Sequence, residues 1–184
     1  MNNTLKQMIQ EDIYRNTGGH KTSSLSCFFS PTLKYLKAFR YAQYYRNNYI
    51  IFRYYKAKLF FLGRRYFIQI PWNTKIGRGF YVGHMGSIIV NPNAIIGDNV
   101  NVAPGMVIGQ TNRGSQKGYP TIGNCVWIGA NAVIVGNIHI GDDVLIAPNS
   151  YVNFDVPNHS VVIGNPAQII PKENATEGYI NHTV

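Results

Sequence analysis

A six-residue repeat dominates the second half of the chain. From Ile122 to Val152 an aliphatic residue recurs at every sixth position without a slip. This period fits neither a helix, which repeats at about 3.6 residues, nor a plain strand alternation of 2. It predicts a solenoid of short parallel strands, with the first and fifth residues of each hexad pointing inward. Small residues such as Gly123 and Gly141 follow the large aliphatic ones, as the corners of a narrow tube require.

The same rhythm extends upstream, where it is interrupted twice. Aliphatic residues lie six apart at Ile70, Ile76 and Val82, and again at Val90, Ile96, Val102 and Ile108. The step from Val82 to Val90 is eight residues, and the step from Ile108 to Ile122 is fourteen, one hexad plus an insertion of eight. Insertions in a solenoid leave the core as loops and often carry function. The interruptions are therefore either sites of chemistry or tolerated surface irregularities.

Residues 1–67 lack hexads and predict helices. Apolar residues at 5, 8, 9 and 13 form one helix face, which Gly18 and Gly19 would end, and a polar link follows at 21–26. Pro31 suits the first turn of one or two further amphipathic helices that run to about Leu62, with Gly63 as a stop. We therefore expect a helical region at 1–67, a solenoid of roughly five coils at 68–170 and a disordered polar tail at 171–184.

The net charge of +9 is concentrated before Arg78. For the basic, aromatic segment at 28–67 we consider packing on the solenoid and on neighbouring subunits, contact with an anionic membrane surface, and nucleic-acid binding. No nucleic-acid motif supports the third, so no nucleic-acid partner is expected. The two cysteines, and the lack of a signal peptide or of an apolar run of about 20 residues, predict a cytoplasmic protein, with the inner face of the membrane as a second location. The histidines are not clustered as three ligands, so no metal is predicted.

At this point the sequence resembles a known family. The hexads, the segment from Lys75 to Ser87 and the Gly164-Asn-Pro-Ala ending are similar to hexapeptide-repeat acyltransferases of the serine O-acetyltransferase branch, over about 68–170. The resemblance implies a mainly β fold, a left-handed parallel β-helix, assembled as a homotrimer with acetyl-CoA in the groove between adjacent subunits. His84, in the eight-residue step, matches the family's catalytic base. A neutral imidazole there can accept the proton of a hydroxyl that attacks the thioester.

Three positions depart from the serine-acetyltransferase pattern. Gly83 replaces an Asp before the base, Gln69 replaces an orienting Asp fifteen residues upstream, and Gly118-Tyr119-Pro120 replaces Arg-His-Pro in the long loop. An amino-acid acceptor needs charged partners, so the substitutions favour a sugar hydroxyl, as in the related enzymes of capsule and exopolysaccharide gene clusters. The alternatives are a serine O-acetyltransferase of cysteine biosynthesis and a scaffold without activity.

Candidate binding residues follow from the same comparison. The acceptor, a small-molecule or lipid-linked sugar, would contact polar, aromatic or small residues at Gln69, Tyr81, Gly83, Asn91 and Tyr119, with Trp72, Asn93 and Gln110 nearby. The pantetheine arm needs accessible backbone, which small residues provide at Gly109, Gly129, Ala130 and Ala147. The adenine end would lie under Gly164, Asn165, Pro166 and Ala167, and the phosphates would face Lys172, Arg113 and Lys117.

Overall fold

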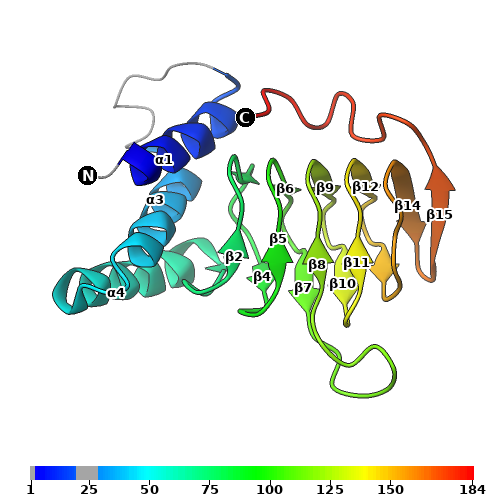
Figure 1. Ribbon diagram of the computed structural model, residues 1–184, viewed down its shortest axis with the longest axis horizontal. Coiled ribbons are helices and arrows are strands. Elements are labelled where there is room, and N and C mark those ends of the chain that lie inside the picture. Colours follow the sequence, from blue (N-terminus) through cyan, green and yellow to red (C-terminus); the bar gives the residue numbers. More distant parts are fainter. Residues whose placement is uncertain (1–2, 20–28) are drawn as a thin grey trace.

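The computed structural model shows three parallel sheets wound into a solenoid, with helices at one end (Figure 1). It describes residues 3–19 and 29–184, so the polar link predicted at 21–26 lies outside the described residues. The sheets run β1-β4-β7-β10-β13, β2-β5-β8-β11 and β3-β6-β9-β12-β14-β15. From β1 to β13, consecutive strands belong to the three sheets in turn, so three strands make one coil and the solenoid has about five coils. The predicted parallel solenoid with an N-terminal helical segment is confirmed.

The strands are short, and all pairings between coils are parallel except the final β14–β15 hairpin. Their bounds are β1 (Ile68–Gln69), β2 (Lys75–Ile76), β3 (Tyr81–Val82), β4 (Ile88–Val90), β5 (Ile95–Ile96), β6 (Asn101–Val102), β7 (Val107–Gly109), β8 (Thr121–Ile122), β9 (Val126–Ile128), β10 (Val133–Val135), β11 (His139–Ile140), β12 (Val144–Ile146), β13 (Tyr151–Val152), β14 (Ser160–Gly164) and β15 (Ala167–Pro171).

Both inward positions of each hexad fill the axis of the solenoid, as predicted. The first residues from Ile122 to Val152 are all buried, with at most 1% of their surface exposed. The fifth residues from Val126 to Val156 are buried as well, and so are the upstream aliphatic positions from Ile70 to Ile108. One continuous apolar core therefore runs through every coil.

A column of glycines explains why small residues follow the large aliphatic ones. A Cβ on Gly97 would lie 2.6 Å from the carbonyl oxygen of Gly123, and one on Gly123 would lie 2.8 Å from the carbonyl of Gly141. The coils thus approach too closely at this corner for any side chain. The next residues form a polar ladder in which, for example, Asn124 Oδ1 accepts the backbone N–H of Asp98 at 2.8 Å. The corner is therefore held by contacts that repeat from coil to coil.

The helical region contains α1 (Asn3–Asn16), α3 (Pro31–Tyr44) and α4 (Tyr49–Tyr66). Pro31 opens α3 as predicted, and the Ser30 hydroxyl caps that helix by accepting the N–H of Leu33. Among the described residues, no helix has the length and apolar character that crossing a membrane requires.

The predicted stop at Gly63 is wrong, because α4 continues to Tyr66. The helix ends at Phe67, whose backbone adopts a left-handed conformation with φ 57° and donates its N–H to Gly63 O. A Cβ on Gly63 would lie 2.7 Å from the carbonyl oxygen of Ile68. The glycine therefore permits close contact between α4 and β1 instead of ending the helix.

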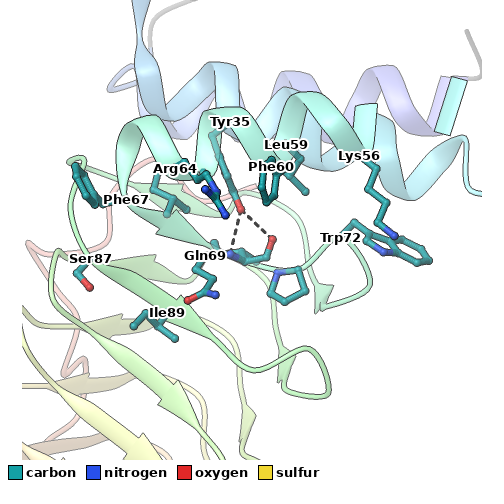
Figure 2. Close-up of a pocket in the computed structure, with 14 residues that line it drawn as sticks. Tyr35, Lys56, Leu59, Phe60, Arg64, Phe67, Gln69, Trp72, Ser87 and Ile89 are labelled. Atoms are coloured by element: carbon teal, nitrogen blue, oxygen red, sulfur yellow. Dashed lines mark hydrogen bonds between the residues drawn. The ribbon is translucent and has the colours of Figure 1, made fainter. Parts of the chain in front are cut away.

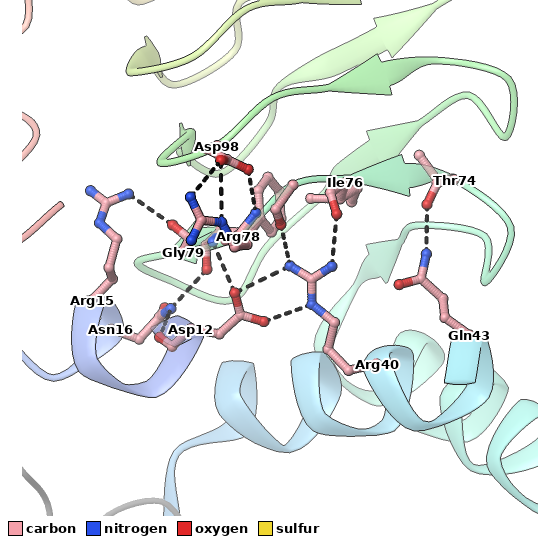
Figure 3. Close-up of polar contacts among 12 residues, drawn as sticks. Asp12, Arg15, Asn16, Arg40, Gln43, Thr74, Ile76, Arg78, Gly79 and Asp98 are labelled. Atoms are coloured by element: carbon pink, nitrogen blue, oxygen red, sulfur yellow. Dashed lines mark hydrogen bonds and ion pairs between the residues drawn. The ribbon is translucent and has the colours of Figure 1, made fainter. Parts of the chain in front are cut away.

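A buried ion pair fixes the helices to the first coil (Figure 3). Arg40 Nε lies 2.8 Å from Asp12 Oδ2, and both side chains are almost completely buried. Arg40 also donates to the carbonyl of Ile76, while Asp12 accepts the backbone N–H of Phe80 at 3.0 Å. Burial raises the pKa of the Asp12 carboxyl, and the Arg40 guanidinium opposes that shift. One pair thus joins α1, α3 and the solenoid.

The C-terminal tail is ordered against the solenoid, so the prediction of disorder from residue 171 is wrong. It runs back across the sheet that contains β12, β9 and β6, and ends beside α1 (Figure 1). Asp143 accepts the backbone N–H groups of Ala175 and Thr176, each at 3.0 Å. Farther along, Asn101 Nδ2 donates to Tyr179 O, and the Tyr179 ring packs 4.9 Å from that of Trp127. Outward-facing side chains of the coils therefore supply the partners that order this polar segment.

Candidate active site

His84 lies where the coil departs from the six-residue rhythm, in the turn between β3 and β4. The end of α4 supports this turn, because the N–H of Gly86 donates to Tyr66 O at 3.2 Å and that of Ile88 to Phe67 O at 3.0 Å. The His84 side chain is exposed and makes no hydrogen bond to the described residues. Its two ring nitrogens are therefore available to a substrate.

His84 opens into a cavity of about 380 Å³. The walls come from α1, from three successive coils and from the C-terminal tail, and comprise Arg15, Gly18, Tyr81, Gly83, His84, Asn101, Val102, Ala103, Trp127, Tyr179, Asn181 and His182. The structure thus brings the predicted acceptor residues Tyr81 and Gly83 together with His84. No wall residue is an aspartate or a glutamate.

Arg15 is the buried cation of this cavity. Its guanidinium donates to Gly79 O at 2.8 Å and to Asn101 Oδ1 at 2.9 Å, and it also reaches the Asn181 carbonyl (Figure 3 shows the Gly79 contact). Burial lowers its pKa from the ordinary value, and the charge is shared among these oxygen acceptors. Arg15 therefore links α1, the coils and the tail at the floor of the cavity.

The tail contributes a second imidazole to the same cavity. His182 lies edge-on to Tyr14 of α1, with 6.0 Å between the ring centroids and 82° between the ring planes. His182, Tyr179 and Arg15 are site residues that the sequence pattern did not predict. That pattern could have identified Asn101 and Trp127, because the coil register places Tyr81, Asn101 and Trp127 side by side on adjacent strands.

Three predicted acceptor residues lie elsewhere in the chain. Gln69 lines a separate cavity of about 440 Å³ between α4 and the first sheet, with Trp72, Lys56 and Arg64 (Figure 2). Its side chain makes no hydrogen bond to the described residues, so it does not orient the His84 ring within one chain.

Asn91 lies at a different corner, just after β4, and donates its Nδ2 to Gln110 Oε1 at 3.1 Å. Gln110 in turn donates to Asn112 Oδ1 at 2.7 Å, and Tyr119 lies exposed in the same long loop. These polar side chains therefore form a group around the loop, apart from the His84 cavity of their own chain.

The predicted cofactor residues divide between the same two corners. One group follows strands of the sheet that contains β3, at the same corner as His84: Gly129 and Ala130 follow β9, and Ala147 follows β12. Gly109 lies at the other corner, where it ends β7 beside the long loop. A Cβ on Gly129 would lie 2.6 Å from the backbone nitrogen of Pro148, so coil packing alone already requires this glycine.

The remaining cofactor candidates lie at the last coil. Gly164 ends β14, Asn165 and Pro166 form the turn, and Ala167 begins β15. Asn165, Pro166 and Lys172 are exposed, and the Gly164 N–H donates to Ser150 Oγ at 3.1 Å. The corner that carries His84 thus extends to this exposed turn. Gly129 and Ala147 are buried within the chain, so the prediction that they leave backbone accessible to a pantetheine arm is wrong for the single chain. The described residues contain no group of three or more His, Cys, Asp or Glu side chains placed to hold a metal ion.

Comparisons with known proteins give the same repeat. Residues 119–153 match the family model described as Bacterial transferase hexapeptide (six repeats). The chain is 38% identical over 106 residues to a serine acetyltransferase of Helicobacter pylori (strain ATCC 700392 / 26695), covering 58% of this chain and 62% of that protein. It is 35% identical over 111 residues to one of Staphylococcus aureus (strain Mu50 / ATCC 700699), covering 60% and 52%. The chain spans less than two thirds of the length of these curated relatives.

Solved structures extend the similarity to the helical region. The soybean serine acetyltransferase apoenzyme superposes with a TM-score of 0.79 at 26% identity, covering 92% of this chain and 70% of that one. The serine acetyltransferase of Brucella abortus strain S19 in complex with coenzyme A gives 0.72 at 26% identity, covering 92% and 67%. By its repeat, its coils and its helical end, the chain is similar to hexapeptide-repeat transferases, and among them to serine acetyltransferases.

Proposed function

We propose that the protein transfers an acetyl group from acetyl-CoA to a hydroxyl, with His84 as the general base. The observation that carries this proposal is the position of His84. It stands in the one coil with an eight-residue step, in a cavity, at the corner that extends to the exposed turn after β14. The similarity to serine acetyltransferases, one of them in complex with coenzyme A, supports the same chemistry.

The proposed reaction needs one proton acceptor and no covalent enzyme intermediate. A ring nitrogen of His84 takes the hydroxyl proton as the oxygen attacks the thioester carbonyl. When the tetrahedral intermediate collapses, the carbon–sulfur bond breaks, and the imidazolium returns the proton to the departing thiolate. The products are the O-acetyl ester and CoA.

The comparisons support serine as the acceptor better than a sugar, because the similar proteins are serine acetyltransferases. Serine O-acetylation, the alternative in the sequence analysis, is therefore the first candidate. A neutral hydroxyl acceptor such as a sugar is the second, because no carboxylate lines the His84 cavity to pair with an ammonium group. Gly83 and Gln69 stand where the serine-acetyltransferase pattern has aspartates, and the loss of these two negative charges favours the same second candidate.

We further propose that a homotrimer completes the site. Within one chain Asn91, Tyr119 and the loop lie at a different corner from His84. A neighbouring subunit that brings its loop corner against the His84 corner would reunite the predicted acceptor residues and enclose the acetyl-CoA arm between subunits.

The test measures CoA release with serine and with a panel of free sugars, for the wild type and for single variants. His84→Ala should lower kcat by about two to four orders of magnitude. His139→Ala is the matched control, since His139 stands on a regular coil outside the cavity and should keep wild-type rates. His182→Ala tests the other imidazole of the cavity.

Each result decides between the candidates. Release with serine alone supports the first acceptor, and release with a sugar alone the second. Unchanged transfer by His84→Ala would remove His84 as the base, and a loss confined to His182→Ala would assign that role to the tail. The absence of transfer to every acceptor would favour a scaffold without activity.

A further inference from the structure

Helix α4 exposes an apolar stripe on the side opposite to the one that packs. Ile50, Tyr54, Ala57 and Phe61 are spaced i, i+4, i+7 and i+11, so all four lie within about 60° of one another around the helix axis. Ile50, Tyr54 and Phe61 are 79%, 60% and 69% exposed. Only Leu59 of this helix is buried, and it lies on the other side. We call these four residues the outer stripe.

Cations border the outer stripe on both sides. At about 100° per residue, Arg53 and Arg64 lie along one edge, and Lys58 and Arg65 along the other. Several of them lie over aromatic rings of the same surface, for example Lys58 Nζ at 6.0 Å from the Tyr54 ring and Arg64 Cζ at 4.3 Å from the Phe60 ring. Long basic side chains of this kind keep their charges in water while their stems cover apolar surface.

No negative charge offsets this surface within its own part of the sequence. Between Asp12 and Asp98 the chain contains no aspartate or glutamate. The cations of α4 form no ion pair with the described residues. The ion pairs that the structure shows join α1 to α3, join α1 to the solenoid, or lie within the solenoid and its tail. Figure 1 shows α4 at the end of the molecule remote from the last coils. The helix therefore presents a purely cationic, aromatic face.

We propose that this face of α4 docks the protein on an anionic lipid surface. Lipid headgroups supply the negative charge, and the outer stripe enters the boundary between headgroups and acyl chains, where Tyr and Phe side chains partition well. A symmetric contact between two copies of α4 would instead bring cations of like charge together without an acidic partner. The proposal concerns peripheral contact and does not depend on the reaction at His84.

Docking through α4 would place the cavity that contains Gln69 beside the lipid surface. Phe60, Lys56 and Arg64 of α4 also line the cavity of about 440 Å³ that contains Gln69 and Trp72 (Figure 2). That cavity therefore opens beside the surface that would contact lipid. A membrane-bound amphiphile can reach that cavity without leaving the interface.

The test is co-sedimentation of the full chain with phosphatidylcholine vesicles that contain no anionic lipid or about 30% phosphatidylglycerol. The wild type should bind only the anionic vesicles and lose binding as salt is raised from about 0.1 M to about 0.5 M. Lys58→Gln/Arg65→Gln should weaken binding roughly 20- to 30-fold, since each basic residue contributes about 1 kcal/mol at such a surface. Phe61→Ser should weaken it about tenfold without affecting the fold, because Phe61 is outside the core.

Arg113→Gln/Lys117→Gln is the matched control, because it removes the same charge from the long loop, far from α4 in Figure 1. It should bind anionic vesicles like the wild type. Equal losses in the two double variants would reduce the effect to net charge and overturn the proposal. Wild-type protein that does not co-sediment with anionic vesicles would overturn the proposal as well. If Phe61→Ser changed the oligomeric state in analytical ultracentrifugation while vesicle binding stayed the same, the outer stripe would be a contact between subunits.

Discussion

Docking of the C-terminal tail should depend on the single carboxylate of Asp143. Its Oδ1 accepts the Thr176 hydroxyl at 2.7 Å and the Thr176 N–H at 3.0 Å, and its Oδ2 accepts the Ala175 N–H at 3.0 Å. In Asp143→Asn, one oxygen can keep the Thr176 contacts as weaker neutral hydrogen bonds. The amide NH₂ then faces the Ala175 N–H, so two donors oppose each other. Together these losses amount to about 2–4 kcal/mol of docking free energy.

Hydrogen exchange of the tail amides measures this loss directly. A loss of about 2 kcal/mol corresponds to roughly 30-fold faster exchange at Ala175 and Thr176, if undocking is the opening event. Asp155→Asn is the matched control, because Asp155 accepts the His139 N–H and does not touch the tail. Since Tyr179 lines the His84 cavity, the acceptor KM should rise more than kcat falls. Unchanged exchange in Asp143→Asn would refute the view that this carboxylate anchors the tail.

Three further predictions concern stability and pH. Arg40→Met leaves the Asp12 carboxylate buried without its partner, so the free energy of unfolding in urea should fall by about 3–5 kcal/mol. A fall below about 1 kcal/mol would contradict the view that this pair fixes the helices to the first coil. Gly123→Ala places a Cβ 2.8 Å from the carbonyl of the next coil, so calorimetry should show a lower melting temperature and a loss of about 1–3 kcal/mol; an unchanged melting temperature would mean that the corner can relax. The hydrogen bond to Asp143 raises the pKa of His159 above its ordinary value of 6.5, and His159 Nδ1 also lies 3.5 Å from Glu173 Oε2 of the tail. The contribution of protonated His159 to tail docking is therefore full below about pH 6.5 and is lost as pH rises through the raised pKa. For Asp143, desolvation raises the pKa but hydrogen bonds from Thr176, His159 and the backbone outweigh it, so its contribution is present above the ordinary value of 3.8 and is lost as pH falls through the lowered pKa. Trp127 fluorescence in a Trp72→Phe background, read against pH, should follow both limbs, and a signal that does not change above pH 6.5 would exclude the His159 contribution.

The hexad period was sufficient to predict the solenoid because burial here depends on position in the repeat. Each aliphatic residue from Ile122 to Val152 has its own place in an axial column, so the sequence spacing maps directly onto the fold. The same reasoning located the irregular step between Val82 and Val90, because a break in the register marks a break in the coil, and the resemblance to the acyltransferase family pointed to His84 within it. Strand propensities alone would not have distinguished these short strands from loops.

The contacts that dock the tail beside the His84 cavity were harder to predict from the sequence. Asp143, Asn101 and Asn99 occupy outward positions, and their partners in the tail lie between 32 and 85 residues away. Such polar contacts have no period, and the composition of the tail by itself resembles a disordered segment. Gly63 was misinterpreted for a related reason, since only the neighbouring carbonyl of Ile68 reveals why a glycine is needed inside α4.

The long loop leaves the solenoid and returns without disturbing the stacking of the coils. Thr111 and Gly118 pair with each other in an antiparallel bridge, while β7 pairs with β10 and β5 with β8 in the register of uninterrupted hexads. The excursion is therefore closed by its own bridge, and Gln116 ties it to the next coil by accepting the N–H of Asn137. Beyond these contacts, at 112–115, the loop is exposed, so insertions, deletions and substitutions there can accumulate at little cost to folding and change what the protein recognises while the solenoid stays the same.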